Sequence, residues 1–343
     1  PQERAAILEQ LSLSDRAILE EGLAYPSDSA GRLMQRQLVT VPESWCVGDT
    51  IDYMRTRTAS LPRDFYDIFV VDAGRKPIGV VPLSRLMRNQ RLVHVHDIMA
   101  TEMTRIAADM DQEDVAFLFQ QYGLVSAPVI DDADRLIGVI TVDDVVHVVQ
   151  DEAEEDIMHL GGVMEDDFYD AVLKTMRRRF SWLLANLATA IAASVVIGLF
   201  DAAIERVVAL AILMPIVASM GGNAGTQTLT VAVRALAMKE LTASNALRIV
   251  GKEVLVGGIN GVAFAAVMGL IAWIWFDDPV IGAVIGTAMV INLLVAGFAG
   301  VVIPLALERW GADPAVGSTV VLTTITDVIG FLSFLGLGAL IFL

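Results

Sequence analysis

Two kinds of hydrophobic pattern divide the chain near Phe180. After this residue, long apolar stretches follow one another with short polar interruptions, whereas before it apolar residues alternate with polar ones or recur every three or four positions. A helix needs about 20 apolar residues to cross a bilayer, and five stretches are long enough. These stretches are 180–200, 207–237, 254–276, 280–307 and 318–343. We therefore predict an all-α membrane domain of five transmembrane helices over residues 180–343.

The polar part before Phe180 contains an internal repeat. Ile68–Met87 (IFVVDAGRKPIGVVPLSRLM) matches Ala127–Val146 (APVIDDADRLIGVITVDDVV). Each copy predicts an apolar strand, an Asp-containing turn, a second strand and the start of a helix. The repeat indicates two α/β modules, which we place at residues 25–97, including a linker at the start, and at residues 98–150.

Helical patterns flank the two modules. Residues 1–24 have apolar positions three and four apart, which predicts the end of a larger helical domain. Residues 151–179 are predicted to form an acidic helix that connects the modules to the membrane domain. Between Asp151 and Asp170 this segment has nine acidic residues and no Lys or Arg. Such a run is usually a solvated helix face, but like charges this close repel unless a cation bridges them, and we favour metal sensing.

Composition and charge narrow the function classes. The chain is 55% hydrophobic with a mean hydropathy of +0.60, which exceeds the values of soluble domains. Of 41 acidic residues 32 precede Phe180, and of 24 basic residues 18 do, so this part carries a charge of 18 − 32 = −14. An acidic part of this kind argues against a nucleic-acid partner and favours metal cations. The single Cys46 excludes an intrachain disulfide and a Cys-rich metal site, and it is consistent with a reducing compartment.

Basic residues predict the orientation in the membrane. Most of those near the predicted spans lie before the first span, between the second and third, and after the fourth: Arg177, Arg178, Arg179, Arg234, Lys239, Arg248, Lys252 and Arg309. Loops rich in Lys and Arg stay on the cytoplasmic side. We therefore expect a multi-pass protein of the plasma (inner) membrane, with a cytoplasmic N-terminus and an extracytoplasmic C-terminus.

The second predicted span contains unusual residues for a membrane helix. Pro215–Leu229 reads PIVASMGGNAGTQTL, in which Asn223, Thr226 and Gln227 are polar and the Pro and Gly residues are poor helix formers. Irregular backbone at membrane depth is tolerated only when it is buried in protein or lines water. The alternative is close helix packing through small residues, with Asn and Gln bonding between helices.

The fifth predicted span contains one carboxylate, Asp327. Thr319, Thr323, Asp327 and Gly330 recur at helical spacing, so they share one face, which is a polar stripe on an otherwise apolar helix. A structural aspartate bonded to a nearby Thr or Asn is one interpretation. The predicted spans have no Lys or Arg in their cores to neutralise the charge, which favours a cation pathway. Carboxylate, hydroxyl and carbonyl oxygens suit Mg²⁺, Ca²⁺ or Mn²⁺ better than zinc or copper.

The repeated modules resemble a pair of CBS (cystathionine-β-synthase) domains. These are β-α-β-β-α modules that sense adenine nucleotides or ions, and a Thr-x-x-Asp motif at the start of the last helix often binds a ribose. Thr141 and Asp144 match this motif, whereas the first copy has Pro82 and Arg85. The alternative is that Asp143 and Asp144 merely cap a helix N-terminus.

The whole chain from about residue 25 resembles the MgtE family of magnesium channels. The resemblance rests on the order of the segments and on PIVASMGGNAGTQTLTVAVRAL and TTITDVIGF. It implies a homodimer with the ion path at the dimer axis, and an acidic N-terminal domain of which residues 1–24 are the end. It also implies a pore formed by Asp327, Thr323, Thr226, Asn223 and Gly222. The implied regulatory metal ligands are Asp144, Glu155, Asp156 and Asp313.

We therefore expect a Mg²⁺-selective channel for divalent cation uptake that intracellular Mg²⁺ gates, with ATP as an optional regulator. An ion-coupled secondary transporter is the main alternative, because such proteins also have glycine-broken helices and an intramembrane Asp. A membrane-anchored nucleotide sensor without transport is a third. An enzyme is not expected, because no nucleophile is paired with a base and all histidines precede Phe180: His94, His96, His147 and His159.

Overall fold

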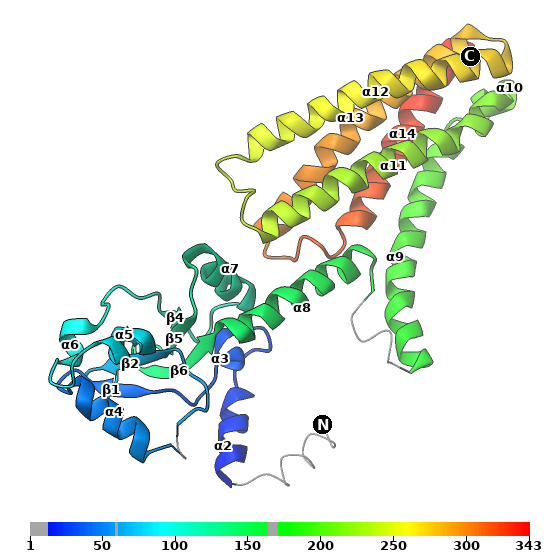
Figure 1. Cartoon of the computed structure of the whole chain (residues 1–343). Coiled ribbons are helices and arrows are strands. Elements are labelled where there is room, and N and C mark those ends of the chain that lie inside the picture. The colour runs from blue at the N-terminus through cyan, green and yellow to red at the C-terminus, as the bar shows by residue number, and fades with distance from the viewer. Residues whose placement is uncertain (1–12, 59–60, 164–170) are drawn as a thin grey trace. The chain divides into compact units, whose positions relative to one another are not determined.

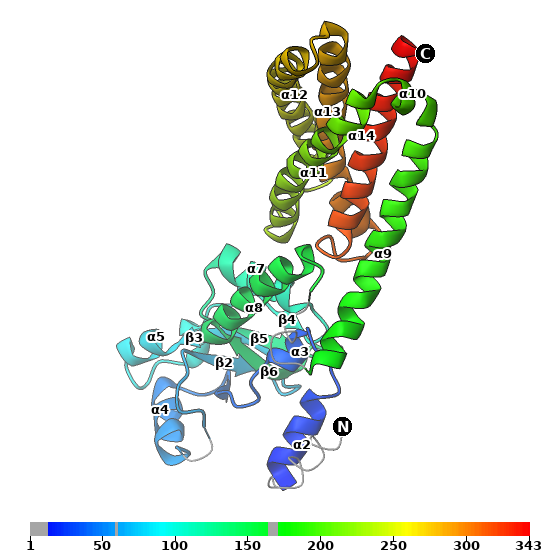
Figure 2. The same cartoon turned by 90° about the vertical axis from the view of Figure 1, so that its right-hand side faces the viewer.

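The computed structural model describes residues 13–58, 61–163 and 171–343 (Figures 1 and 2). The chain forms two compact units, Pro1–Glu152 and Ala153–Leu343, and helix α8 (Val142–Leu160) contains the boundary between them. Residues 1–12 and 164–170 lie outside the described residues. Parts of the predicted segments 1–24 and 151–179 are therefore not tested.

Unit 1 contains the two predicted α/β modules. Its described residues begin with α2 (Leu13–Gly22) and α3 (Ala30–Leu33). The first module contains β1 (Thr40–Pro42), α4 (Val47–Thr56), β2 (Asp67–Val71), β3 (Pro77–Pro82) and α5 (Leu83–Arg88). The second contains α6 (Val95–Ile98), β4 (Ile106–Ala107), α7 (Gln112–Tyr122), β5 (Ser126–Ile130), β6 (Leu136–Thr141) and the start of α8. In each module the first strand is parallel to the second and the second is antiparallel to the third, which confirms the predicted repeat.

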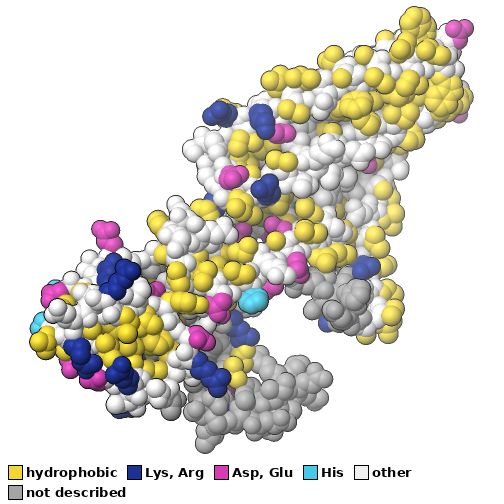
Figure 3. All heavy atoms as spheres, in the orientation of Figure 1, with side chains coloured by type: hydrophobic (Ala, Val, Ile, Leu, Met, Phe, Trp, Pro, Cys, Tyr) yellow, Lys and Arg dark blue, Asp and Glu magenta, His cyan; other side chains and the backbone are white. Residues whose placement is uncertain are grey.

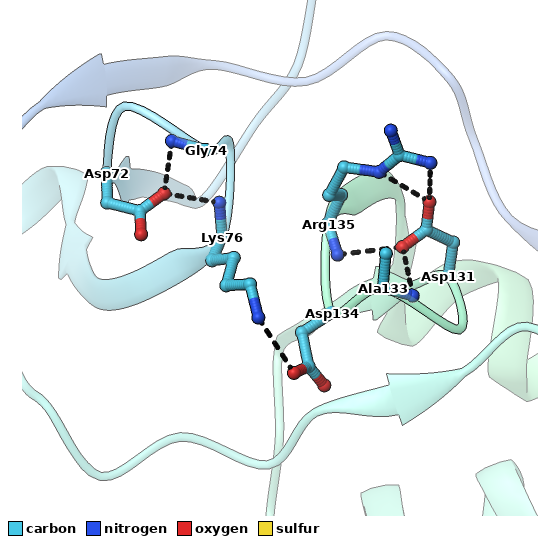
Figure 4. Close-up of polar contacts among 7 residues, drawn as sticks. All are labelled: Asp72, Gly74, Lys76, Asp131, Ala133, Asp134 and Arg135. Carbon is cyan, nitrogen blue, oxygen red and sulfur yellow. Dashed lines mark hydrogen bonds and ion pairs between the residues drawn. The ribbon is translucent and has the colours of Figure 1, made fainter.

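The hairpin turns of the two modules are built alike (Figure 4). Asp72 Oδ1 accepts hydrogen bonds of 2.8 Å from the backbone N–H groups of Gly74 and Lys76. Asp131 Oδ1 does the same at the equivalent place, accepting from the N–H groups of Ala133 and Arg135 at 2.9 and 2.8 Å. An aspartate that bonds its own backbone two residues onward favours a tight turn. The Asp-containing turns read from the sequence are thereby explained.

The first residues of each module complete the core of the other module. Ala30 and Met34 are buried in the core of the second module, and the Met34 sulfur occupies the space that a side chain at Gly138 would need. Met99 packs on the first module, and its sulfur lies at Gly79 in the same way. Ala30 and Met34, from the start of the predicted segment 25–97, thus contribute to a hydrophobic core, and the predicted domain bounds stay a prediction.

Direct contacts also join the two modules. Lys76 Nζ forms an ion pair with Asp134 Oδ2 at 3.1 Å (Figure 4). Ser126 Oγ donates a hydrogen bond of 2.6 Å to Asp67 Oδ2. Between these contacts Phe69 of β2 is buried against apolar residues of β6. The modules therefore pack as one body.

The described residues of unit 2 form the end of α8 and six further helices: α9 (Val172–Gly198), α10 (Asp201–Arg206), α11 (Val208–Ala237), α12 (Ala246–Phe276), α13 (Pro279–Arg309) and α14 (Ser318–Phe342). Among the described residues, α9, α11, α12, α13 and α14 are long and apolar enough to cross a membrane. Hydrophobic side chains cover much of their visible surface (Figure 3). The expectation of five such helices is confirmed.

One sequence expectation for the connection into unit 2 is wrong in detail. The connecting segment 151–179 is not one helix, because α8 ends at Leu160 and α9 begins at Val172. Gly162, with φ of 68°, follows the end of α8, and glycine adopts this backbone conformation without strain. The backbone of α11 is helical throughout 208–237, including Pro215 and the glycines, which agrees with the predicted span 207–237 and with close packing through small residues.

Helix α13 is at the centre of the membrane helices. It packs against α11, α12 and α14, while α11 and α14 also pack against each other. Side-by-side placement of α11 and α14 is visible in both views (Figures 1 and 2). Close approach depends on small residues: a Cβ added at Gly225 of α11 would lie 2.9 Å from a methyl carbon of Leu322 in α14. The two helices that carry the predicted pore residues are thus direct neighbours.

Candidate ion path and acidic cluster

Asp327 lies in the middle of α14 and is partly exposed. Its carboxylate forms no hydrogen bond or ion pair with any residue that the structure describes. Thr323 and Thr326 are close to Asp327 in the sequence, but their hydroxyls donate to backbone carbonyls of α14. The Thr323 hydroxyl donates to Thr319 O at 2.9 Å, and the Thr326 hydroxyl donates to Leu322 O at 3.1 Å. This arrangement argues against a structural aspartate bonded to a nearby Thr or Asn.

One face of α11 is polar and exposed on the single chain. Asn223, Thr226, Gln227 and Thr230 lie on this face, whereas Gly221, Gly225 and Thr228 are buried on the other. The Thr226 hydroxyl donates to Gly222 O at 2.9 Å, so it is satisfied within the helix. Uncompensated amide groups in hydrocarbon cost several kcal/mol each. The face of Asn223 and Gln227 must therefore meet water or protein and not lipid.

Sequence reasoning missed a second carboxylate in the membrane helices, Glu253. It lies in α12 with only 13% of its side chain exposed. Its Oε2 accepts a hydrogen bond of 3.4 Å from the hydroxyl of Thr228 in α11, and its Oε1 lies 3.3 Å from Lys252 Nζ. Because α12 begins at Ala246 and not at 254, Glu253 lies inside the helix instead of just before it. The Lys-Glu pair in a run of apolar residues is the signal that could have identified it.

An acidic cluster forms where the end of α8 meets the loop between α13 and α14. His159 Nδ1 lies 2.9 Å from Asp313 Oδ2, and His159 Nε2 lies 3.5 Å from Glu155 Oε1. Burial raises the pKa of Asp156, and the negative charges of Asp313 and Glu155 raise it further, while His159 opposes the shift. The structure thus brings together three of the predicted ligands, and adds a histidine that the sequence interpretation left out.

The cluster is not a preformed metal site. The described parts of the chain contain no group of three or more His, Cys, Asp or Glu side chains arranged to hold a metal ion. Asp313 is instead occupied by His159 and by the N–H of Ala315, which donates to Oδ1 at 2.8 Å. Asp144, the fourth predicted ligand, belongs to unit 1. Metal binding by these residues stays a prediction.

Thr141 and Asp144 form a local hydrogen-bonded group with Gln35. The Thr141 hydroxyl donates to Asp144 Oδ2 at 2.8 Å, and Gln35 Nε2 donates to the same oxygen at 2.7 Å. A cleft of about 710 Å³ lies elsewhere in unit 1, where Asp67, Tyr122 and Ser126 are among its lining residues. Thr141 and Asp144 do not line this cleft. Helix capping, the alternative interpretation, agrees with these contacts, and nucleotide binding by the pair stays a prediction.

Comparisons with known proteins identify the family. A family profile described as a divalent cation transporter, MgtE, matches residues 214–337, and the CBS domain profile matches residues 30–91 and 95–151. The magnesium transporter MgtE of Thermus thermophilus is 33% identical over 330 residues, which cover 95% of this chain and 73% of that protein. The chain belongs to the MgtE family. The MgtE proteins of Enterococcus faecalis and Bacillus subtilis are 31% and 29% identical, over 94% and 96% of this chain and 71% and 73% of theirs.

Two solved structures of soluble domains are also similar to part of the chain. One is the cytosolic domain of the Mg²⁺ channel MgtE in complex with ATP, with 33% identity and a TM-score of 0.40, covering 42% of this chain and 58% of that one. The other is the soluble part of a magnesium transporter, with 30% identity and a TM-score of 0.41, covering 44% of this chain and 59% of that one. The matched part spans less than two thirds of either solved chain.

Proposed function

We propose that this MgtE-family chain forms a Mg²⁺-selective channel for divalent cation uptake, with Asp327 as the pore carboxylate. The observation that supports it most is that Asp327 is in a membrane helix without a partner among the described residues. A carboxylate at this depth costs several kcal/mol unless something compensates it, and a passing cation does so. Mg²⁺ loses its waters reluctantly, so Asp327 would bind the hydrated ion through its water shell and release it readily.

The pore requires a second copy of the chain. Asn223, Thr226 and Gln227 form an exposed polar face on α11, and α11 packs beside α14. In a homodimer with the ion path at its axis, these faces would meet across a water-filled opening instead of facing lipid. Gly222 and Thr323 would line the same path, one beside Asn223 and the other one helical turn before Asp327.

Gating would use the acidic cluster on the cytoplasmic side. Two carboxylates about 4 Å apart repel by roughly 4 kcal/mol at an effective dielectric constant near 20. A decisive two-state switch takes about 5.5 kcal/mol of differential binding, so a few bridged pairs suffice. Intracellular Mg²⁺ would bridge Glu155, Asp156 and Asp313, with Asp144 as a further ligand, and hold the channel closed. At low Mg²⁺ the carboxylates would repel one another and the channel would open.

A nucleotide could regulate the same gate. The solved MgtE domain similar to unit 1 was crystallised with ATP. In this chain Thr141 and Asp144 would bind the ribose once Gln35 releases them, because its amide occupies the same carboxylate oxygen. Equilibrium binding of ATP to the full-length protein, with and without Asp144→Ala, tests this part of the proposal.

Flux into liposomes tests the pore. Purified protein is reconstituted, and entry of Mg²⁺, Mn²⁺, Co²⁺ and Ca²⁺ is measured in turn for the wild type, Asp327→Ala and Asp327→Asn. The proposal expects Mg²⁺ flux that both substitutions abolish while the protein stays folded. Robust Mg²⁺ flux in Asp327→Ala would contradict the pore assignment. Single-channel currents support a channel, whereas flux that saturates and depends on a counter-ion supports a secondary transporter.

A further inference from the structure

The amide of Asn292 lies at the centre of the membrane helices, where α11, α13 and α14 meet. Asn292 belongs to α13 and is fully buried. Its Nδ2 donates a hydrogen bond of 2.9 Å to Val217 O of α11. This bond crosses between two helices and fixes which way the amide faces, because the opposite orientation would place two oxygens against each other. Asn292 therefore ties α13 to the helix that carries the GGNAGTQ segment.

The same amide occupies the space above two glycines on opposite helices. A Cβ added at Gly221 of α11 would lie 2.7 Å from Asn292 Cγ and 2.9 Å from its Oδ1. A Cβ added at Gly330 of α14 would lie 2.8 Å from Nδ2. Contacts this short do not occur between real side chains, so the flat amide fits only because both positions are glycine. Asn292 thus acts as a spacer between α11 and α14.

Packing alone does not explain an amide at this place. Asn292 Oδ1 is buried and has no hydrogen-bond partner among the residues that the structure describes. Leaving a buried acceptor unpaired is costly, and an apolar side chain would fill the site without that cost. Unlike an apolar side chain, the amide has an N–H that donates a hydrogen bond to α11. Its flat shape also lets α14 approach closely. A buried amide with an unpaired oxygen, placed where three helices meet, therefore indicates a role beyond filling space.

The two glycines are next to the residues proposed for the ion path. Gly221 lies two residues before Asn223 in α11. Gly330 lies three residues after Asp327, which corresponds to about 4.5 Å along α14. A change in the space that Asn292 fills therefore moves the backbone that carries Asp327 relative to the backbone that carries Asn223.

We infer that Asn292 is a positioning residue that sets the spacing of α11 and α14, and through it the ion selectivity and apparent Mg²⁺ affinity of the pore. The inference rests on the proposed function, because it requires these two helices to line the ion path. Asn292 itself does not touch the ion. It acts through Gly221 and Gly330 on the placement of Asn223 and Asp327.

Three variants of the full-length protein test this role by liposome flux. Asn292→Ala removes the spacer. We expect the half-saturating Mg²⁺ concentration to rise about fivefold and the preference for Mg²⁺ over Mn²⁺ to fall. The reason is that small displacements of a binding group greatly lower its affinity for the ion. Gly330→Ala forces a Cβ against the amide, and we expect flux to fall about tenfold. In the double variant the new Cβ enters the space that the amide leaves, so flux and ion preference should return to within about threefold of the wild type.

A matched control separates positioning from a general packing loss. Met289→Ala removes a fully buried side chain one turn earlier on α13 and should lower the melting temperature without changing the ion preference. If Asn292→Ala changes stability but not ion preference, as the control does, the positioning role is wrong. It is also wrong if Gly330→Ala lowers flux equally with and without Asn292. Asp327→Ala is measured beside them. Unchanged flux in that variant overturns the pore proposal itself, whereas lost flux with unaffected Asn292 variants overturns the positioning role only.

Discussion

His159 at the end of α8 and Asp313 in the loop between α13 and α14 are joined by a hydrogen bond of 2.9 Å. His159 also lies within 3.5 Å of Glu155, so one imidazole separates two carboxylates of the acidic cluster. The two carboxylates come from segments that are far apart in the sequence. This histidine therefore links α8 by a hydrogen bond to the loop before the proposed pore helix.

Replacing His159 should loosen the acidic cluster when Mg²⁺ is absent. In His159→Ala the carboxylates lose their shared partner. Losing an ion pair this exposed should shift the equilibrium between the closed and the loosened cluster by roughly threefold. We expect proteolysis of the Asp151–Asp170 segment to speed up by about that factor without Mg²⁺, and to match the wild type at millimolar Mg²⁺. His147→Ala is the control, because His147 is exposed on the same helix. Equal cleavage of both variants without Mg²⁺ would show that the His159 link has no role.

Glu253 should stabilise the contact between α12 and α11 through Thr228. Glu253→Ala leaves the buried Thr228 hydroxyl without its partner, and we expect a loss of about 1–3 kcal/mol in stability. Glu253→Gln keeps an acceptor oxygen and should lose less. Thermal unfolding in detergent, with the exposed Glu240→Ala as the control, measures both. If Glu253→Gln is as unstable as Glu253→Ala, the charge beside Lys252 matters more than the hydrogen bond.

Gly138 should not tolerate a side chain as long as Met34 is present. A Cβ at Gly138 overlaps the Met34 sulfur, and such overpacking typically costs about 1–3 kcal/mol. Met34→Ala alone leaves a cavity and should cost about 2–5 kcal/mol. The double variant should cost less than the sum, because the new methyl group enters the vacated space. Hydrogen exchange of unit 1 in the whole protein measures these effects, with Gly22→Ala as the control because no atom lies within 4 Å of its added Cβ. Additive costs would contradict the contact.

The turn of the second module should weaken in acid. A hydrogen bond from the Arg135 side chain, followed by one from the Arg135 backbone N–H, lowers the pKa of Asp131 below its ordinary value of 3.8. A lowered pKa means that this stabilisation is complete above the ordinary value and is lost as the pH falls through the lower, folded-state value. Amide exchange in residues 131–136, corrected for intrinsic rates, should therefore accelerate below pH 3.8. In Asp131→Asn the turn acceptor remains but cannot titrate, so an unchanged pH dependence in this variant would exclude Asp131 as the cause.

The sequence predicted those features that local patterns determine. Alternating apolar residues and Asp turns identified both modules, and apolar length identified the membrane helices. The exchange of Met34 and Met99 between modules was not predictable, because a short apolar segment does not reveal which distant core it joins. The predicted helix over 207–237 continues through Pro215, since a helix satisfies its own hydrogen bonds in a medium without water and this outweighs the poor propensity of Pro and Gly.

The candidate site was predictable only in part. Asp327 was identified because a lone carboxylate in an apolar helix is conspicuous, and Asn223 because polar residues cluster around it. Asn292 was missed since it stands alone in its apolar run, with no polar neighbour at helical spacing. His159 was overlooked because it lies at the end of a run whose acidic residues dominate the pattern. In both cases the decisive partner, Gly330 or Asp313, is distant in the sequence.

The exchanged segments at Met34 and Met99 constrain how this region can evolve. Losing, duplicating or transplanting a single module would expose two hydrophobic cores at once, one on each side of the break. Gene rearrangements that preserve a folded protein should therefore move both modules together, with the residues that precede the first. The repeat looks like two independent copies in the sequence, but the two copies fold as one piece.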